Sequence, residues 1–164
     1  MAKLVAHSDR RVLRDLARRV ADLAADAVQE HRRAIWYAQN RLRPIRPPVF
    51  ISPEGAWIEL IPPGSLHCEG QHARGIELAL RQRIYAHEHF GDDQVVDAEW
   101  RVPFAVTTTG WGIGPEIHRP DAERGAYVWD APIRTMADIE QIQTPWAEHD
   151  PLESERRLAW HQEL

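Results

Sequence analysis

Apolar residues recur at helical spacing in three long stretches of the chain. The clearest is 70–90, where the apolar side chains stand three or four positions apart: Ala73, Ile76, Leu80 and Ile84. The stretch 10–25 shows the same spacing, with arginines on its other face. A second helix follows from Asp26, a capping residue with Gln29 three positions on, and Pro44 ends it. The pattern predicts a helical hairpin before residue 46.

Two other segments are apolar without helical spacing and run directly into polar residues. They are RPPVFISPEGAWIE at 46–59 and VVDAEWRVP at 95–103. Each is typical of a short buried strand with carboxylates at its C-terminal end. With the helix 70–90 between them, the order is β-α-β, for which a right-handed crossover between parallel strands is expected. Ligands of such folds bind at the C-terminal ends of the strands.

The remaining pattern is weaker. It predicts a short edge strand over 127–130, a helix that Thr135 caps and that runs through Ile142, and a last helix over 151–164. The glycine-rich stretch TTTGWGIG at 107–114 lacks the lysine and the spacing of a phosphate-binding loop. We therefore interpret 107–114 as a conformational loop and not as a nucleotide site.

Composition limits the classes of protein that fit. The 164 residues are 43% hydrophobic and 27% charged, which is typical of one globular domain. No apolar run approaches the roughly 20 residues that span a bilayer, and no secretory signal opens the chain. Cys68 is the only cysteine, so an intrachain disulfide is excluded. The cytoplasm is the expected location, without membrane association.

Charge is distributed unevenly along the chain. Residues 1–46 carry 11 Lys and Arg against 5 Asp and Glu, whereas residues 47–164 carry 9 against 20. A basic arm can bind nucleic acid or a membrane surface. No interleaving of aromatic and basic residues accompanies it, which favours docking on the acidic remainder or on another subunit, and no nucleic-acid partner is expected. The sequence thus divides into an N-terminal helical arm, 1–45, and a second region, 46–164.

Four segments together resemble the N-terminal portion of the uroporphyrinogen decarboxylase superfamily. They are RPPVFISPEG at 46–55, DDQVVDAEWRVP at 92–103, APIRTMADIEQIQTP at 131–145, and the helix 154–164. The resemblance implies an α/β fold: a helical hairpin and the first βαβ part of a TIM-type (β/α)₈ barrel, which is incomplete in this chain. Most of the barrel would follow Leu164.

Departures from the family's pattern point to one of its branches. True uroporphyrinogen decarboxylases carry an arginine-rich loop after the first strand, but residues 52–57 contain no arginine and include Glu54. The resemblance therefore lies closer to the branch of corrinoid-linked methyltransferases. It implies a corrinoid protein as partner, and zinc and a corrinoid in the full-length enzyme, with no cofactor assigned to this segment. Uroporphyrinogen decarboxylation, with a tetrapyrrole substrate, is the alternative.

The candidate site residues follow from these segments. Asp97 and Glu99 flank Ala98, the position that corresponds to the family's catalytic aspartate, and either would serve as acid/base or polar anchor. Candidate substrate contacts are Glu54, Trp57, Arg101 and Trp111. The alternative is that these carboxylates are solvated strand ends and that the tryptophans pack in the core.

A metal site has only weak support in the sequence. His67, Cys68 and His72 offer three zinc-ligand types close together, but their spacing is not a recognised zinc pattern, so a structural role is favoured.

A function of a different class also fits. Two parallel strands with free edges need cover, so the chain can instead be a non-catalytic domain. It would pair its open sheet edge with a partner, with the remainder of a barrel, or with a second copy in a homo-oligomer.

Overall fold

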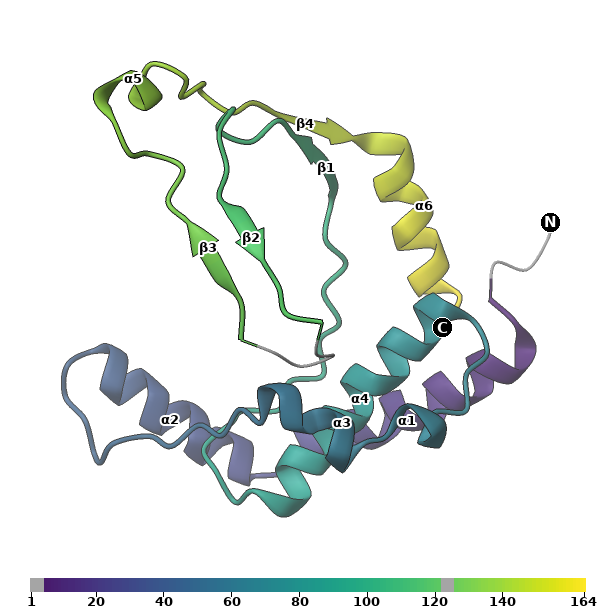
Figure 1. Cartoon of the computed structure of the whole chain (residues 1–164). Helices are drawn as coiled ribbons and strands as arrows, with labels where there is room; N and C mark the ends of the chain where they lie inside the picture. The colour runs from purple at the N-terminus through teal and green to yellow at the C-terminus, as the bar shows by residue number, and fades with distance from the viewer. Residues whose placement is uncertain (1–4, 122–125) are drawn as a thin grey trace. The chain divides into compact units, whose positions relative to one another are not determined.

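A computed structural model describes residues 5–121 and 126–164 of the chain, so the first four residues of the expected arm 1–45 lie outside the description. Figure 1 labels its elements. The chain is mixed α/β and mostly helical, with small two-stranded sheets. It divides into two compact units: unit 1 comprises Met1–Arg101 and Leu158–Leu164, and unit 2 comprises Val102–Arg157.

The predicted N-terminal helical hairpin is confirmed. Helix α1 spans His7–Ala24 and helix α2 spans Val28–Asn40. The Asp26 carboxylate accepts a hydrogen bond from the backbone N–H of Val28 at 2.8 Å, close to the start of α2. The N-cap position is Ala27, however, one residue after the predicted Asp26, and the Gln29 side chain bonds to Leu23 and Val96 and forms no capping box.

The core of unit 1 forms between α1 and α4, which lie side by side in Figure 1. Helix α4 spans Gln71–His89, within one residue of the predicted 70–90 at each end. The apolar positions that predicted the two helices meet in one buried cluster: Leu13, Val20, Cys68, Ala73, Ile76, Leu80, Ile84 and Val96. Trp160 and Leu164 pack against this cluster. Helical periodicity thus identified the buried faces as well as the elements.

Short helical turns fill the connection between the predicted first strand and α4. They are the 3₁₀ turn η1 at Glu54–Ala56, the one-turn helix α3 at Trp57–Leu60, and the 3₁₀ turn η2 at Pro63–Ser65. Trp57 contacts the aromatic rings of Tyr85 and Phe90, with centroids 6.0 and 5.7 Å away. These ring contacts attach α3 to the C-terminal end of α4.

The prediction of two parallel strands was wrong for the described residues: 46–51 and 95–103 form no ladder, and no barrel is present. The two segments do approach each other, since the Asp93 N–H donates to the Val49 carbonyl at 2.8 Å. However, the N–H of Val49 donates to the Asp93 carboxylate and that of Ile51 to the Asp92 carboxylate, at 2.8 and 3.0 Å. Because carboxylates accept from these N–H groups, strand-to-strand bonds do not continue.

Unit 2 contains the strands, which pair antiparallel in two separate ribbons. Strand β1 (Ala105–Thr108) pairs with β4 (Ala147–Asp150), and β2 (Glu116–His118) pairs with β3 (Val128–Asp130). The predicted edge strand at 127–130 is confirmed as β3. The sequence did not predict β1, β2 or β4, and the expected loop 107–114 contributes its first two residues to β1.

The C-terminal helices follow the sequence more closely. Helix α5 spans Met136–Ile139 and has the expected cap at Thr135, which forms a capping box with Asp138, but it ends three residues before the predicted Ile142. Helix α6 spans Pro151–Gln162, in agreement with the predicted 151–164. No helix in the described ranges is long and apolar enough to cross a membrane.

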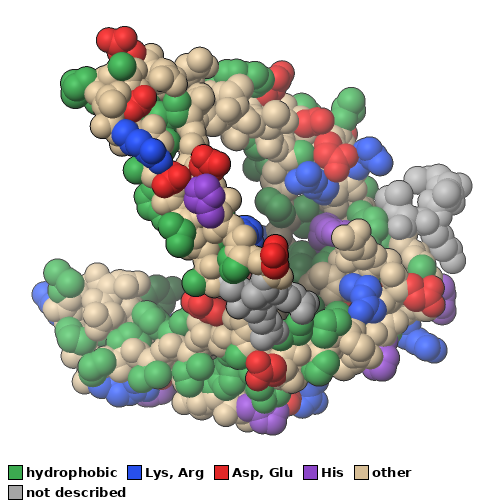
Figure 2. Space-filling model, viewed as in Figure 1, with side chains coloured by type: hydrophobic (Ala, Val, Ile, Leu, Met, Phe, Trp, Pro, Cys, Tyr) green, Lys and Arg blue, Asp and Glu red, His purple; other side chains and the backbone are tan. Residues whose placement is uncertain are grey.

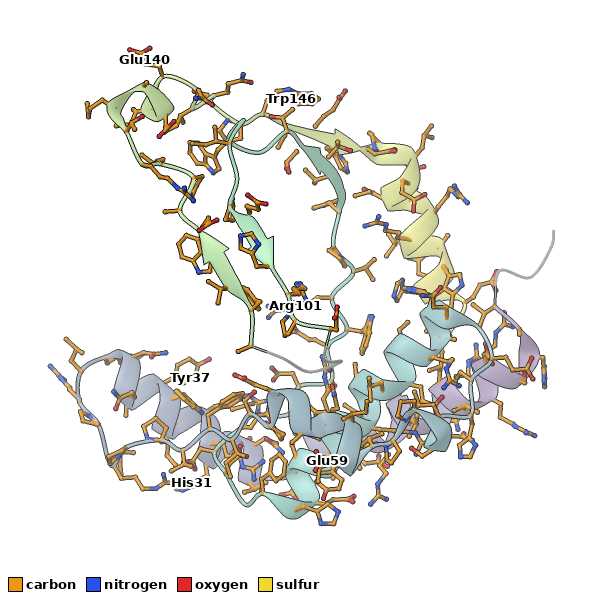
Figure 3. The ribbon with its side chains drawn as sticks, viewed as in Figure 1. His31, Tyr37, Glu59, Arg101, Glu140 and Trp146 are labelled. Carbon is orange, nitrogen blue, oxygen red and sulfur yellow. The ribbon has the colours of Figure 1, made fainter. Side chains whose placement is uncertain are left out.

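Unit 2 buries little of its apolar surface. Ala105 is the one buried residue among its described positions, and Trp111, Trp129 and Trp146 are each more than half exposed. Figure 2 shows hydrophobic side chains at the surface of the molecule, and Figure 3 labels Trp146, which stands just before β4. Two-stranded ribbons are marginal in water unless a further layer covers one face.

Candidate functional site

Helix α2 holds the extended segment 92–97 by three side-chain hydrogen bonds. The Gln29 side chain, fully buried, accepts from the N–H of Val96 at 2.9 Å. Arg32 donates to the Gln94 carbonyl at 2.9 Å, and the Trp36 indole donates to the Asp93 carbonyl at 2.8 Å. Buried backbone groups need partners. Here side chains of α2 take the place of a neighbouring strand.

Asp93 joins the segments 46–51 and 92–101. Its carboxylate accepts two hydrogen bonds from the Arg46 guanidinium, at 2.6 and 2.5 Å, and one from the N–H of Val49. The hydrogen bonds from Arg46, followed by that from Val49, hold the pKa of Asp93 well below its ordinary value of 3.8. The carboxylate therefore stays ionised near neutral pH and fixes the spacing of the two segments.

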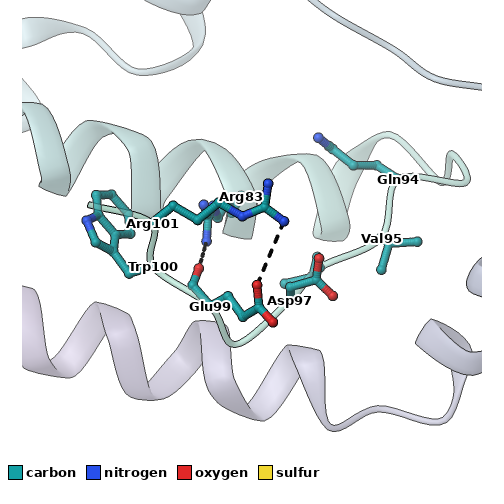
Figure 4. A pocket seen from close by; sticks show the side chains of 8 residues that line it. Arg83, Gln94, Val95, Asp97, Glu99, Trp100 and Arg101 are labelled. Carbon is teal, nitrogen blue, oxygen red and sulfur yellow. Dashed lines mark hydrogen bonds and ion pairs between the residues drawn. The ribbon is translucent and has the colours of Figure 1, made fainter. Parts of the chain in front are cut away.

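A pocket of about 390 Å³ opens beside the end of the second segment (Figure 4). Its lining residues are Arg83, Gln94, Val95, Val96, Asp97, Glu99, Trp100 and Arg101. Arg83 of α4 donates to the Glu99 carbonyl at 3.1 Å, and its guanidinium lies 5.2 Å from the centroid of the Trp100 ring. One arginine thus holds both the backbone and an aromatic wall of the pocket.

A second pocket of about 230 Å³ adjoins the first and shares Arg83 and Gln94 with it. The other residues that line it are Phe50, Ile51, Ser52, Pro53, Trp57, Ala79 and Gln82. The ends of the two segments that were predicted as strands therefore face neighbouring hollows over α4. The β-α-β interpretation required the two segment ends to lie near each other. They do so here without any pairing between strands.

The structure brings four of the six predicted site residues to these two pockets. Asp97, Glu99 and Arg101 line the larger pocket and Trp57 lines the smaller. Glu54 lies in η1 and is absent from both linings. Trp111 belongs to unit 2, where its carbonyl accepts from the N–H of Gln143 at 2.9 Å.

The two candidate catalytic carboxylates are open to solvent and paired with arginines. Asp97 lies 3.0 Å from the Arg33 guanidinium, and Glu99 lies 3.8 Å from that of Arg101. Their side chains are 51% and 72% exposed. Of the two roles expected from the sequence, this environment favours the polar anchor, because exposed carboxylates can accept hydrogen bonds from a ligand.

Sequence reasoning missed Arg33, Arg83 and Gln94. Arg83 lines both pockets and Arg33 pairs with Asp97, but nothing in the spacing of these two arginines separates them from the solvated arginines on the helices. Gln94 follows the turn into the second segment and carries no recognised motif. Only the packing of α2 and α4 against residues 92–101 brings these three side chains to the site.

The candidate zinc ligands have separate surroundings. Burial, and then a hydrogen bond to Glu77, raises the pKa of the Cys68 thiol to about 12, so it is protonated at neutral pH. His67 is exposed, and its N–H donates to the Glu77 carboxylate at 2.9 Å. The His72 ring packs at 4.4 Å from that of Trp160. Among the described residues, His67, Cys68 and His72 are not a set whose ligand atoms all lie within 4.8 Å of one another, so these donors do not fit zinc.

Comparisons of the chain with known proteins find no family model that matches, no similar curated protein and no similar solved structure.

Proposed function

We propose that unit 1 carries a catalytic site similar to those of the uroporphyrinogen decarboxylase superfamily, and that it serves corrinoid-linked methyl transfer. One observation carries the proposal. The ends of segments 46–53 and 92–101, which enclose α4 in the sequence, border adjoining pockets that contain Asp97, Glu99, Arg101 and Trp57. A ligand bound at these hollows would therefore contact side chains of both segments at once.

The residues of the pockets suit a small polar acceptor better than a tetrapyrrole. Asp97 and Glu99 supply anchors for hydrogen-bond donors, with Arg33 and Arg101 balancing their charge. Trp57 adds an apolar wall beside them. The loop 52–57 offers no arginine for a polycarboxylate, and the carboxylates of Asp97 and Glu99 in the larger pocket would repel one. This charge pattern supports methyl transfer over decarboxylation of a porphyrinogen.

The corrinoid, carried by a partner protein, would supply or accept the methyl group. In this proposal the described residues bind and orient the acceptor. The superfamily's methyltransferases activate the acceptor on zinc, but His67, Cys68 and His72 do not fit that ion, so we assign no zinc step to them.

The test is methyl transfer with the purified chain and methylcobalamin as donor. A thiol serves as acceptor, and the visible absorbance of the cobalamin reports the reaction. We expect turnover above the buffer rate, with a loss of roughly tenfold or more in the double variant D97N/E99Q. The matched control is E88Q, a charged position of the same unit outside both pockets. Absence of turnover, or equal loss in the control, would overturn the proposal, and conversion of uroporphyrinogen III would favour decarboxylation instead.

A second candidate, a non-catalytic interaction domain, is favoured by exposed apolar residues at 42–51. Leu42, Ile45 and Phe50 are 88%, 69% and 56% exposed. Surfaces of this kind commonly mark association sites. Sedimentation equilibrium of the wild type and of F50S separates the candidates: an oligomer that dissociates in F50S, without turnover in the methyl-transfer assay, supports the interaction domain.

A further inference from the structure

We propose that one face of the β2–β3 ribbon binds a single divalent transition-metal ion, best matched by zinc, through Glu116, His118 and Asp130. The three side chains lie on elements of unit 2, and none of them is among the residues assigned above to methyl transfer, so the two proposals stand or fall independently.

The strand register brings the three residues together. Glu116 pairs directly with Asp130, while His118 stands two positions from Glu116 on the same strand. Side chains two apart on a strand point to one face, and directly paired residues share a face. Glu116, His118 and Asp130 therefore occupy the same face of the ribbon, and Ile117 and Trp129 occupy the other.

The distances between ligand atoms are close to those of a metal site. One nitrogen or oxygen from each of the three side chains lies within 4.8 Å of the others. Nε2 of His118 is 3.0 Å from Oδ2 of Asp130. Bonds of 2.0–2.2 Å around tetrahedral zinc place the ligand atoms about 3.3 Å apart. A modest rotation of the Glu116 side chain would complete the set, and because the face is exposed, water can supply the fourth ligand.

The donor types narrow the choice of ion. One imidazole nitrogen with two carboxylates suits zinc and neighbouring transition metals, whereas magnesium and calcium favour oxygen ligands alone. The ribbon also has an electrostatic reason to bind a cation, since the paired carboxylates of Glu116 and Asp130 repel each other. Arg134 neutralises part of this charge at 3.2 Å from Asp130 and therefore competes with a metal for the carboxylate.

The experiment measures metal binding to the full chain after dialysis against a chelator. Zn²⁺ is titrated by calorimetry, and Co²⁺ is followed by its visible absorption. We expect one ion per chain, binding that weakens roughly tenfold or more in H118A, and a smaller loss in the near-isosteric E116Q. The matched control is H149A, because His149 is an exposed histidine on β4 of the same unit.

A fourth variant distinguishes the loss of a metal ligand from misfolding of the protein. Arg134→Ala frees the Asp130 carboxylate, so we expect it to tighten zinc binding several-fold, a gain that an unfolded variant would not produce. Zinc binding that is equal in wild type and H118A, or lost equally in H149A, would overturn the proposal. Either result would mean that His118, Asp130 and Arg134 form an ion-pair network only.

Discussion

Units 1 and 2 differ in how they bury their polar and apolar side chains. All the fully described buried charged and polar side chains lie in unit 1: Asp9, Gln29, Arg32, Glu77, Asp92 and Asp93. Each accepts or donates at least one hydrogen bond, and a continuous apolar cluster lies between α1 and α4. Unit 2 instead pairs short strands and leaves its large apolar side chains exposed.

The difference shows which interactions stabilise each unit. In unit 1, helices supply both the apolar core and the side chains that satisfy extended backbone. In unit 2 the described residues form hydrogen bonds between strands, but Ala105 is the only one of them that is buried. Because burial of apolar surface is the dominant favourable term in folding, the stability of the chain should depend on unit 1, and unit 2 should gain most from anything that binds it.

The largest effect is expected from Glu77, the carboxylate at the centre of unit 1. It is fully buried and accepts from the N–H groups of His67 and Cys68 and from Arg81. Its burial acts to raise the pKa, but these hydrogen bonds lower it overall. Glu77→Ala leaves buried donors without a partner, so we expect a loss of about 3–5 kcal/mol in the free energy of unfolding. Urea denaturation followed by circular dichroism measures it, with E88Q as the exposed control, for which a much smaller change is expected.

Next in size is the truncation of a core leucine. Leu13 is 1% exposed and lies in the apolar cluster between α1 and α4. Leu13→Ala removes packing and leaves a cavity, which typically costs about 2–5 kcal/mol. The same denaturation assay measures this loss. An unchanged midpoint would mean that α1 does not pack on α4 in solution.

A smaller, pH-dependent effect is expected from Asp93. Its pKa is lower in the folded protein than the ordinary 3.8, so the unfolded chain binds the proton more readily. Its contribution to stability is therefore complete above about pH 4 and is lost as the pH falls further. Asp93→Asn should cost about 1–3 kcal/mol at pH 7 and flatten the loss of stability between pH 4 and pH 2. Denaturation midpoints at a series of pH values test this, and a parallel acid response of variant and wild type would contradict it.

The smallest effect is expected in unit 2. Leu152 at the start of α6 is 75% exposed. Leu152→Ala is the same chemical change as Leu13→Ala but removes no buried contact, so its cost should stay below about 0.5 kcal/mol. The two leucine variants form a matched pair in one assay. A cost for L152A as large as that for L13A would show that a partner or a second copy covers this side chain in solution.

Much of the helical fold could be predicted from the sequence, because its signals are local. The apolar stripe of 70–90 gave α4 to within one residue, and Thr135 with Asp138 gave the start of α5. The strand predictions succeeded only at 127–130. An apolar segment such as 49–51 becomes a strand only when another backbone accepts its hydrogen bonds, and here carboxylates of Asp92 and Asp93 accept them instead.

The candidate site was predicted in part. Asp97, Glu99, Arg101 and Trp57 were found because they follow apolar segments at positions where α/β proteins bind ligands. Arg33 and Arg83 were missed because the helices carry many arginines. Only their contacts with Asp97 and Glu99, which are distant in the sequence, distinguish these two from the others. The face formed by Glu116, His118 and Asp130 was missed for the same reason, since it depends on the register between two strands.

The sequence by itself determined the helices, their buried faces and the absence of a disulfide, because these depend on residue spacing and composition over a few turns. Only the tertiary structure decided what the extended segments do. The backbone groups of 92–97 could bond to a strand or to side chains, and the docking of α2, through Gln29, Arg32 and Trp36, favoured the side chains. Long-range partners of this kind leave no periodic signal in a sequence, because each depends on packing between residues distant along the chain.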